Sequence, residues 1–305
     1  MMTSDLFGGT VEKTARKKRG RGSDYKQRFQ TSRWAEDIFF EHLNTYPEII
    51  TIRFGLSKFT EAHEIDVGDE SIKEPDLLAY RKSSLNSDEV TYLVERKLAL
   101  DEIPRNELPK FIYEKATAAF EVEFSPYKAA EMKDRHKLPA PYGPEKTAPK
   151  NMPAPPTAPN IFVKDEDLGR LTLWQERYKV PEIFVAHFFD QEAFMINLQQ
   201  IVEFKRRYNC INISEKKEII NLQRNSGIFF SEQSYDRVDA QGAGEKKWVF
   251  RVHPKVATKL GVIQDVNVGS DLSVSSSKKY VSHVLFSGGK LSFSDEFFAE
   301  TNLPG

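Results

Sequence analysis

The chain has 305 residues, of which 39% are hydrophobic and 12% aromatic, enough for one large domain with a substantial core. No apolar run reaches the roughly 18 residues of a transmembrane helix and no signal-peptide core is visible, so we expect a cytoplasmic protein with no membrane partner. The single cysteine, Cys210, excludes an intramolecular disulfide framework and cysteine-based zinc sites. The formal net charge of −1 does not indicate a nucleic-acid binder, although charge is segregated along the chain.

Residues 1–24 are polar and contain glycine, and six basic side chains fall between Lys13 and Arg21. We expect a disordered basic arm. Such an arm can neutralise backbone phosphates of a nucleic acid, and a plain solvated tail explains the same composition equally well.

The first half of the chain alternates helical and strand-like patterns. Apolar residues at helical spacing predict a helix over 27–44, which ends before Pro47. The residues that follow predict a strand at 48–54, strands at 77–81 and 90–97 joined as a hairpin by turn residues 82–88, and a helix over 105–123.

Eight prolines between Leu138 and Pro159 mark residues 138–160 as a loop insertion. After it, the pattern predicts a helix over 165–178, a buried strand within 180–189, a strand at 194–198 and a short helix over 199–207. Residues 206–305 contain short β-like stretches at 248–252, 280–286 and 291–293, so we expect a mixed, β-rich C-terminal annex.

Two of the strand-like runs contain charged residues at informative positions. Pro75-Asp76 opens one run, and Glu95-Arg96-Lys97 ends the next. Residues i and i+2 of a strand share a face, so Glu95 and Lys97 would point the same way, and the hairpin would bring Asp76 beside them. Two carboxylates can hold Mg²⁺ through oxygen, and an adjacent lysine can orient the water that attacks a phosphodiester. A strand that starts with Asp76 and an exposed Glu95–Lys97 pair would give the same pattern without any chemistry.

With these residues the chain resembles the PD-(D/E)XK nuclease superfamily, and most of all its type II restriction endonucleases. The resemblance covers residues 25–205 and implies a restriction-endonuclease-like α/β/α core with a central mixed sheet. It implies that Asp76 and Glu95 ligate Mg²⁺, with the backbone carbonyl of Arg96 as a further ligand, and that Lys97 positions the attacking water. Many relatives add an acid from the first helix, which makes Glu36 a candidate, although a helix surface charge explains Glu36 as well.

The acidic stretch 61–76 is interpreted first as a solvated loop, although Glu64, Asp66 and Glu74 are near enough in sequence to reach the metal. His63 is interpreted as a structural or surface histidine, and His187 as a core or sheet histidine with its hydrogen bonds satisfied. No histidine spacing suggests zinc.

Base edges are usually contacted by Arg, Lys, Asn and Gln, so the C-terminal half is expected to recognise DNA. The candidates, each of which is equally well a solvated surface residue, are Lys205, Arg206, Arg207, Arg224, Asn225, Lys246 and Lys247. The partners expected are double-stranded DNA, a second copy of the chain if the recognised site is palindromic, and a cognate DNA methyltransferase in the same system. Two alternatives stay open: a repair, resolvase or mobile-element nuclease, and a DNA-binding protein without catalysis.

Overall fold

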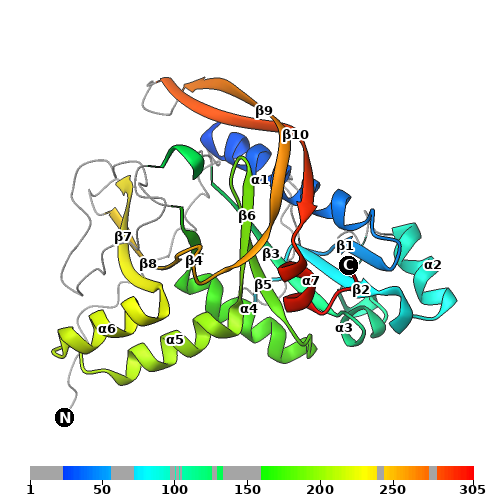
Figure 1. The fold of residues 1–305 in the computed structure, drawn as a ribbon, viewed down its shortest axis with the longest axis horizontal. Coiled ribbons are helices and arrows are strands. Elements are labelled where there is room, and N and C mark those ends of the chain that lie inside the picture. The colour runs from blue at the N-terminus through cyan, green and yellow to red at the C-terminus, as the bar shows by residue number, and fades with distance from the viewer. Residues whose placement is uncertain are drawn as a thin grey trace, which may run out of the picture.

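The fold is a mixed α/β arrangement around a large curled sheet, seen in a computed structural model of the chain (Figure 1). The structure describes residues 23–55, 72–96, 100, 103, 105–125, 129–132, 159–238, 244–274 and 280–305. The helices are α1 (Ser23–Leu43), α2 (Ser87–Arg96), α3 (Phe111–Glu114), α4 (Asp165–Tyr178), α5 (Leu198–Cys210), α6 (Lys216–Ser226) and α7 (Asp295–Thr301), with short 3₁₀ turns η1 (Lys82–Ser84), η3 (Arg105–Glu107) and η4 (Ala129–Glu131). The strands are β1 (Ile49–Arg53), β2 (Leu77–Arg81), β3 (Ala118–Phe124), β4 (Ile161–Lys164), β5 (Ile183–Phe188), β6 (Glu192–Asn197), β7 (Ile228–Val238), β8 (Gly244–Val252), β9 (Thr258–Val274) and β10 (Tyr280–Phe293).

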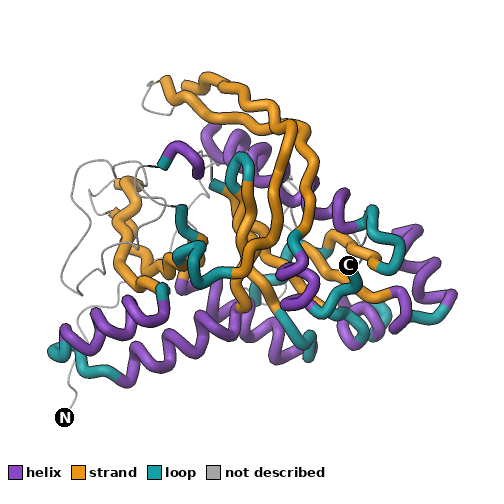
Figure 2. Tube along the Cα trace, viewed as in Figure 1, coloured by secondary structure: helices purple, strands orange, loops and turns teal. Residues whose placement is uncertain are grey.

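Among the described residues, seven strands form the main sheet in the order β1-β2-β3-β5-β6-β9-β10. Strands β3 and β5 run parallel, while the other neighbouring pairs are antiparallel. A second sheet, in the order β4-β8-β7, is antiparallel. The β9–β10 pair continues beyond the main sheet as a long two-stranded ribbon that curves over it (Figure 2).

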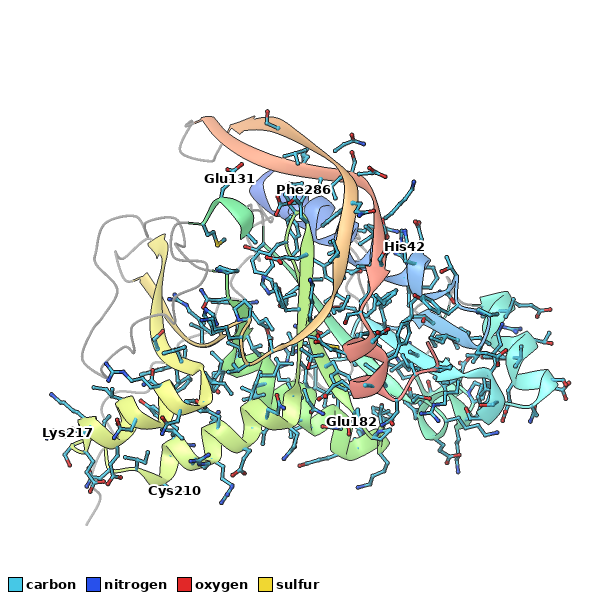
Figure 3. All side chains as sticks on the ribbon, viewed as in Figure 1. His42, Glu131, Glu182, Cys210, Lys217 and Phe286 are labelled. Atoms are coloured by element: carbon cyan, nitrogen blue, oxygen red, sulfur yellow. The ribbon has the colours of Figure 1, made fainter. Side chains whose placement is uncertain are left out.

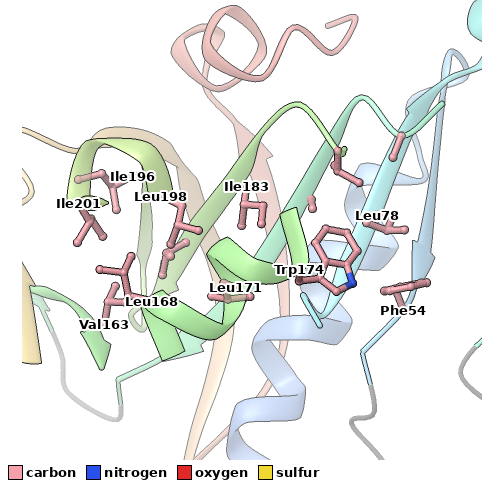
Figure 4. Close-up of a cluster of buried hydrophobic side chains, with 14 of the residues drawn as sticks. Phe54, Leu78, Val163, Leu168, Leu171, Trp174, Ile183, Ile196, Leu198 and Ile201 are labelled. Atoms are coloured by element: carbon pink, nitrogen blue, oxygen red, sulfur yellow. The ribbon is translucent and has the colours of Figure 1, made fainter. Parts of the chain in front are cut away.

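Each face of the main sheet buries its own hydrophobic core. On one face, α1 and α7 pack through Phe39 and Phe297 against Phe120 of β3, with ring centroids 4.8 and 6.0 Å from Phe120. On the other face, Leu171 and Trp174 of α4 cover β2 and β5, and the second sheet adds Phe250 and neighbouring residues (Figure 4). The strands between these layers are therefore covered on both sides, as the continuous burial of β5 shows.

Most of the expected elements are confirmed. The helices predicted over 27–44, 165–178 and 199–207 correspond to α1, α4 and α5, and the strands predicted at 48–54, 77–81, within 180–189 and at 194–198 correspond to β1, β2, β5 and β6. The three C-terminal β-like stretches fall within β8 and β10. Residues 1–22 of the expected arm and 138–158 of the expected insertion lie outside the described residues.

The strand predicted at 90–97 is wrong, because residues 87–96 form helix α2. The residues interpreted as a turn start this helix. The Asn86 side chain accepts a hydrogen bond from the Glu89 backbone N–H, and the Glu89 carboxylate accepts one from the Asn86 N–H, both at 2.9 Å. This reciprocal cap satisfies two otherwise free donors and favours helix over strand. The apolar run then buries Leu93 on one side and exposes Val94 on the other.

The helix predicted over 105–123 is also wrong, because only Phe111–Glu114 is α-helical and Ala118–Phe124 forms β3. Strands β9 and β10 extend the main sheet, and α7 packs on the α1 side of it. In the described part of the chain, no helix combines the length and apolar character needed to cross a bilayer.

Candidate metal centre

Asp76 lies at the head of β2, where three strands meet. Its backbone carbonyl accepts hydrogen bonds from the N–H groups of Phe54 (2.8 Å) and Gly55 (3.4 Å) at the end of β1. Its carboxylate Oδ2 accepts one from the backbone N–H of Val122 on β3 (2.7 Å). A side chain at Gly55 would place its Cβ 2.8 Å from the carbonyl oxygen of Pro75, so only glycine permits this approach. Both the backbone and the carboxylate of Asp76 are therefore fixed.

Strand β3 places two more acids beside Asp76. Its residues Phe120 and Val122 point to the α1 face, so Glu121 and Glu123 between and after them point to the α4 face. The register pairs Leu77 with Phe120 and Leu78 with Ala119, and its continuation puts Asp76 next to Glu121. Glu121 is buried, while Glu123 and Asp76 are partly exposed.

Lys73 provides the positive charge of this cluster. Its ammonium group forms an ion pair with Oε1 of Glu121 and lies 3.4 Å from Oδ2 of Asp167 in the first turn of α4. The backbone N–H of Lys73 donates to the carbonyl of Arg170, so α4 positions the segment before β2. Lys164, at the end of β4, pairs with Asp167 at 3.5 Å.

Burial and mutual repulsion perturb the acids. Burial, followed by the charges of Glu121 and Glu36, raises the pKa of Asp76 well above its ordinary value. Burial raises the pKa of Glu121 despite the opposing effect of Lys73. Burial and the charge of Glu121 raise the pKa of Glu123 to about 7. Burial alone would lower the pKa of Lys73, but the surrounding carboxylates raise it, so Lys73 stays protonated.

The cluster has more negative than positive groups. The acids are Glu36, Asp76, Glu121, Glu123 and Asp167, and the bases that act on them are Lys73 and Lys164. Oε2 of Glu121 is buried and has no hydrogen-bond partner among the described residues. A buried carboxylate oxygen of this kind is costly unless a cation satisfies it, and carboxylate oxygens are the ligands that Mg²⁺ and Mn²⁺ accept. The donor set thus fits a hard divalent ion.

The carboxylates do not already converge on a single point. Within the described ranges, no three His, Cys, Asp or Glu side chains are grouped as a ready-made metal site. The Lys73 ammonium group is bound to one of the two Glu121 oxygens. Binding of an ion by Asp76 and Glu121 would therefore involve a shift of Lys73.

His187 of β5 lies on the same face of the main sheet as Glu123. The parallel register places it opposite Glu123. Its side chain is buried, and neither ring nitrogen has a hydrogen-bond partner in the described part of the chain. Burial lowers the pKa of His187 to about 3, so the imidazole is neutral.

Glu95, which was expected to form the site with Asp76, is not placed beside it. Glu95 lies on α2 with 63% of its side chain exposed, and its charged neighbour is Arg96, 3.7 Å away. The guanidinium of Arg96 lies over the ring of Tyr92. Glu95 is also absent from the groups that act most strongly on the Asp76 carboxyl. Lys97 lies outside the described residues.

Of the other candidates, Glu36 is brought to the cluster. It is buried on α1, not a helix surface charge, and its charge acts on Asp76. Glu74 instead pairs with Arg105, with two contacts of 2.6 Å. His63, Glu64 and Asp66 lie outside the described residues.

The residues expected to contact DNA lie on α5, α6 and β8. Helix α5 begins where Asn197 pairs with Phe184, at the opposite end of the β5–β6 hairpin from His187. On α5, Lys205 pairs with Asp165 at 2.5 Å and Arg206 pairs with Glu203 at 2.8 Å, while Arg207 follows. Arg224 and Asn225 are exposed on α6, and Figure 3 shows the labelled Cys210 and Lys217 where these two helices meet at the edge of the molecule. Lys246 and Lys247 belong to β8. Their contact with DNA stays a prediction.

A separate cavity of about 760 Å³ opens at the β5–β6 turn. Asp190 and Glu192 line it together with residues 262–266 of β9, and none of the clustered acids does. Its acidic lining does not complement a phosphate.

The sequence does contain a signal for β3 that the helical interpretation missed. Phe120-Glu121-Val122-Glu123-Phe124 alternates strictly between apolar and acidic residues, a pattern of period two that is typical of a strand with one polar face. Comparison with protein-family models, with curated proteins and with solved structures finds no match for this chain.

Proposed function

We propose that this protein is a divalent-metal-dependent deoxyribonuclease whose centre consists of Asp76, Glu121 and Glu123, with Lys73 beside them. One observation carries the proposal. Adjoining strands direct these carboxyl groups to one face, where negative charge exceeds positive charge and one Glu121 oxygen has no partner among the described residues.

The chemistry follows from the ligands. Asp76 and Glu121 would hold Mg²⁺, with Glu123 and Glu36 near enough to influence it. When bound, this ion would polarise a phosphodiester oxygen and lower the pKa of a water molecule. Lys73 keeps its proton, so it would act by its charge, holding the scissile phosphate or the attacking water, and not as a base. Glu123, whose pKa is about 7, is the residue suited to accept a proton from that water near neutral pH.

The resemblance to PD-(D/E)XK nucleases supports this proposal with a changed assignment. The resemblance implies the order helix, strands, helix, strand. Elements α1, β1 to β3, α4 and β5 follow this order only when α2 and α3, between β2 and β3, and β4, between β3 and α4, are taken as insertions, and α4 replaces the helix expected over 105–123. Asp76 would keep the role of a metal ligand. Glu121-Val122-Glu123 replaces Glu95-Arg96-Lys97, and it departs from the pattern at the third position, where a glutamate stands instead of lysine. Lys73 would supply the missing positive charge from the segment before β2.

Within this class we propose a type II restriction endonuclease that cuts double-stranded DNA at a short sequence, acts as a homodimer and has a cognate methyltransferase. A repair, resolvase or mobile-element nuclease would use the same centre on branched or damaged DNA. The two are separated by substrate: discrete fragments from unmethylated phage DNA support the restriction enzyme, while cleavage of a four-way junction alone supports the alternative.

The central experiment compares two glutamates. Unmethylated phage DNA is incubated with the full chain in Mg²⁺, in Mn²⁺ and in EDTA, beside the Glu121→Gln and Glu95→Gln variants. We expect cleavage that requires the metal, a loss of at least about a hundredfold in Glu121→Gln, and unchanged cleavage in Glu95→Gln. Glu95 is the matched control because it is the same residue type on an exposed helix surface.

The opposite pattern would contradict the assignment. Cleavage lost in Glu95→Gln and kept in Glu121→Gln would return the site to α2. DNA binding without cleavage by the unaltered chain, in either metal, would instead favour the DNA-binding protein without catalysis.

A further inference from the structure

We propose that Arg105 is a positioning residue of the metal centre, which raises the affinity for the ion by fixing Asp76 through Glu74 and Phe54. Arg105 has this role only if Asp76 ligates the ion, so the proposal rests on the proposed function. It extends the centre to an ion pair outside the acidic cluster, the one between Arg105 and Glu74.

The guanidinium group of Arg105 joins separate parts of the chain. Its Nε and Nη2 donate to the two carboxylate oxygens of Glu74, each at 2.6 Å. Nη2 also donates to the backbone carbonyl of Phe54 at 2.7 Å, and Nη1 donates to that of Leu100 at 3.2 Å. The guanidinium carbon lies 4.4 Å from the centre of the Phe54 ring. Arg105 therefore ties the end of β1 to the segment that leads into β2.

Both of these anchors are connected to Asp76. Phe54 donates its backbone N–H to the Asp76 carbonyl at 2.8 Å, and Glu74 lies two residues before Asp76 in the chain. The contacts close a ring that runs from Arg105 through Glu74 to Asp76 and returns through Phe54. The Val122 N–H fixes one carboxylate oxygen, Oδ2, so the orientation of the whole carboxylate depends on how firmly this ring holds the Asp76 backbone.

The shape of the guanidinium group, and not its charge alone, suits this role. Arg105 is not among the groups that act most strongly on the pKa of Asp76. The side chains of Arg105 and Glu74 are 23% and 22% exposed, so water screens their ion pair less than it screens a pair on the surface. Donation to both Glu74 oxygens and to backbone carbonyls requires a planar fork of N–H groups, which the ammonium group of a lysine lacks.

The test is Mn²⁺ binding to the full chain without DNA, measured by electron paramagnetic resonance of the free ion, beside Arg105→Lys and Glu74→Gln. We expect the dissociation constant for Mn²⁺ to rise at least about tenfold in both variants, because residues that orient a metal ligand typically contribute that much. Arg105→Lys keeps the positive charge and loses the fork, so an unchanged Mn²⁺ affinity in this variant would overturn the proposal.

DNA cleavage separates ligand positioning from a general loss of folded protein. In Arg105→Lys, the Mg²⁺ concentration that gives half-maximal cleavage should rise at least about tenfold, while the rate at saturating Mg²⁺ stays within about threefold of the unaltered chain. A loss of folded protein would instead lower the rate equally at every Mg²⁺ concentration. A lower rate at saturating Mg²⁺ with an unchanged half-maximal concentration would also contradict the role of Arg105.

Lys115→Met is the control, because it breaks another ion pair between a base and a glutamate, the 2.7 Å contact of Lys115 with Glu89. Its Mn²⁺ affinity should equal that of the unaltered chain, and an equal loss in Lys115→Met and Arg105→Lys would overturn a specific role. Thermal melting in EDTA shows whether each variant is folded at the assay temperature. If Arg105→Lys is not folded, Glu74→Gln decides the outcome, since it removes the charged acceptor and leaves the arginine in place.

Failure of this inference differs from failure of the proposed function. Mn²⁺ that is bound by the unaltered chain, lost in Asp76→Asn and bound with equal affinity by Arg105→Lys would overturn the role of Arg105 and leave the nuclease proposal standing. No Mn²⁺ bound by the unaltered chain, together with no DNA cleavage, would overturn both.

Discussion

Replacing Glu123 with glutamine should remove a pH-dependent loss of stability in the metal-free protein. In the folded chain the pKa of Glu123 is raised from its ordinary value of 4.5 to about 7, by burial and by the charge of Glu121. Between these two values the folded state holds a proton that the unfolded state has released. The free energy of unfolding must therefore fall as the pH rises through this range.

The expected magnitude follows from the two pKa values. Their separation corresponds to about 3 kcal/mol once both states are ionised, near pH 8, and to less than about 1 kcal/mol at pH 5. Glutamine does not ionise, so Glu123→Gln should be more stable than the unaltered chain by about 3 kcal/mol at pH 8 and nearly equal to it at pH 5.

His187 changes the free energy of unfolding with pH in the opposite direction to Glu123. The stability of Glu123→Gln must therefore be compared with that of the unaltered chain at each pH. The pKa of His187 is lowered to about 3, so its contribution to stability is lost as the pH falls below its ordinary value of 6.5. Both proteins contain His187, so its effect cancels in the difference. Lys73 stays protonated throughout and adds no slope.

The assay is urea unfolding in EDTA at pH 5, 6, 7 and 8, followed by the fluorescence of the buried Trp34 and Trp174. The assay is repeated with millimolar Mn²⁺. The free energy of unfolding of the unaltered chain should then depend less on pH, because the bound ion takes the place of the protons on the clustered acids. A stability difference that does not change between pH 5 and pH 8 would refute the electrostatic reasoning, and with it the view that these acids form a centre deficient in positive charge.

Three other substitutions test the architecture of the site. Gly55→Ala would place a Cβ 2.8 Å from the Pro75 carbonyl oxygen. We expect about 1–3 kcal/mol of lost stability and a marked loss of cleavage. Full cleavage activity would show that this contact does not fix Asp76. Lys73→Met removes the ion partner of the buried Glu121. The free energy of unfolding, measured by urea unfolding, should fall by about 3–5 kcal/mol at pH 8 but by much less at pH 5. An equal loss at both pH values would contradict the role of this ion pair. Tyr80→Phe removes the 2.7 Å hydrogen bond to the carbonyl of Ile112, and should lower stability by about 1–2 kcal/mol while cleavage at saturating Mg²⁺ stays unchanged; impaired cleavage would link this side of the core to the centre.

The sequence was sufficient for elements whose pattern has one physical interpretation. The apolar run around Ile183–Phe188 is continuous and short, which only a buried strand explains well, and the acidic first turn of α4 marks a helix start. The Pro75-Asp76 step before β2 was likewise identified from local pattern alone. These features depend on neighbours within a few residues, which the sequence displays directly.

The site needed the tertiary structure because its partners are distant in sequence. Asp76 meets Val122 across 46 positions, and His187 meets Glu123 through a parallel pairing that no local pattern encodes. The Glu95 motif was misleading because a short apolar run with a terminal charge pair fits a strand or an amphipathic helix equally, and the Asn86–Glu89 cap decided for the helix. The sequence by itself determined which residue types were present and where several strands lie. The alternation of residues 120–124 already puts Glu121 and Glu123 on one face, but only the sheet register decided which residues of β2 and β5 lie beside them, because a shift of one residue would change those neighbours.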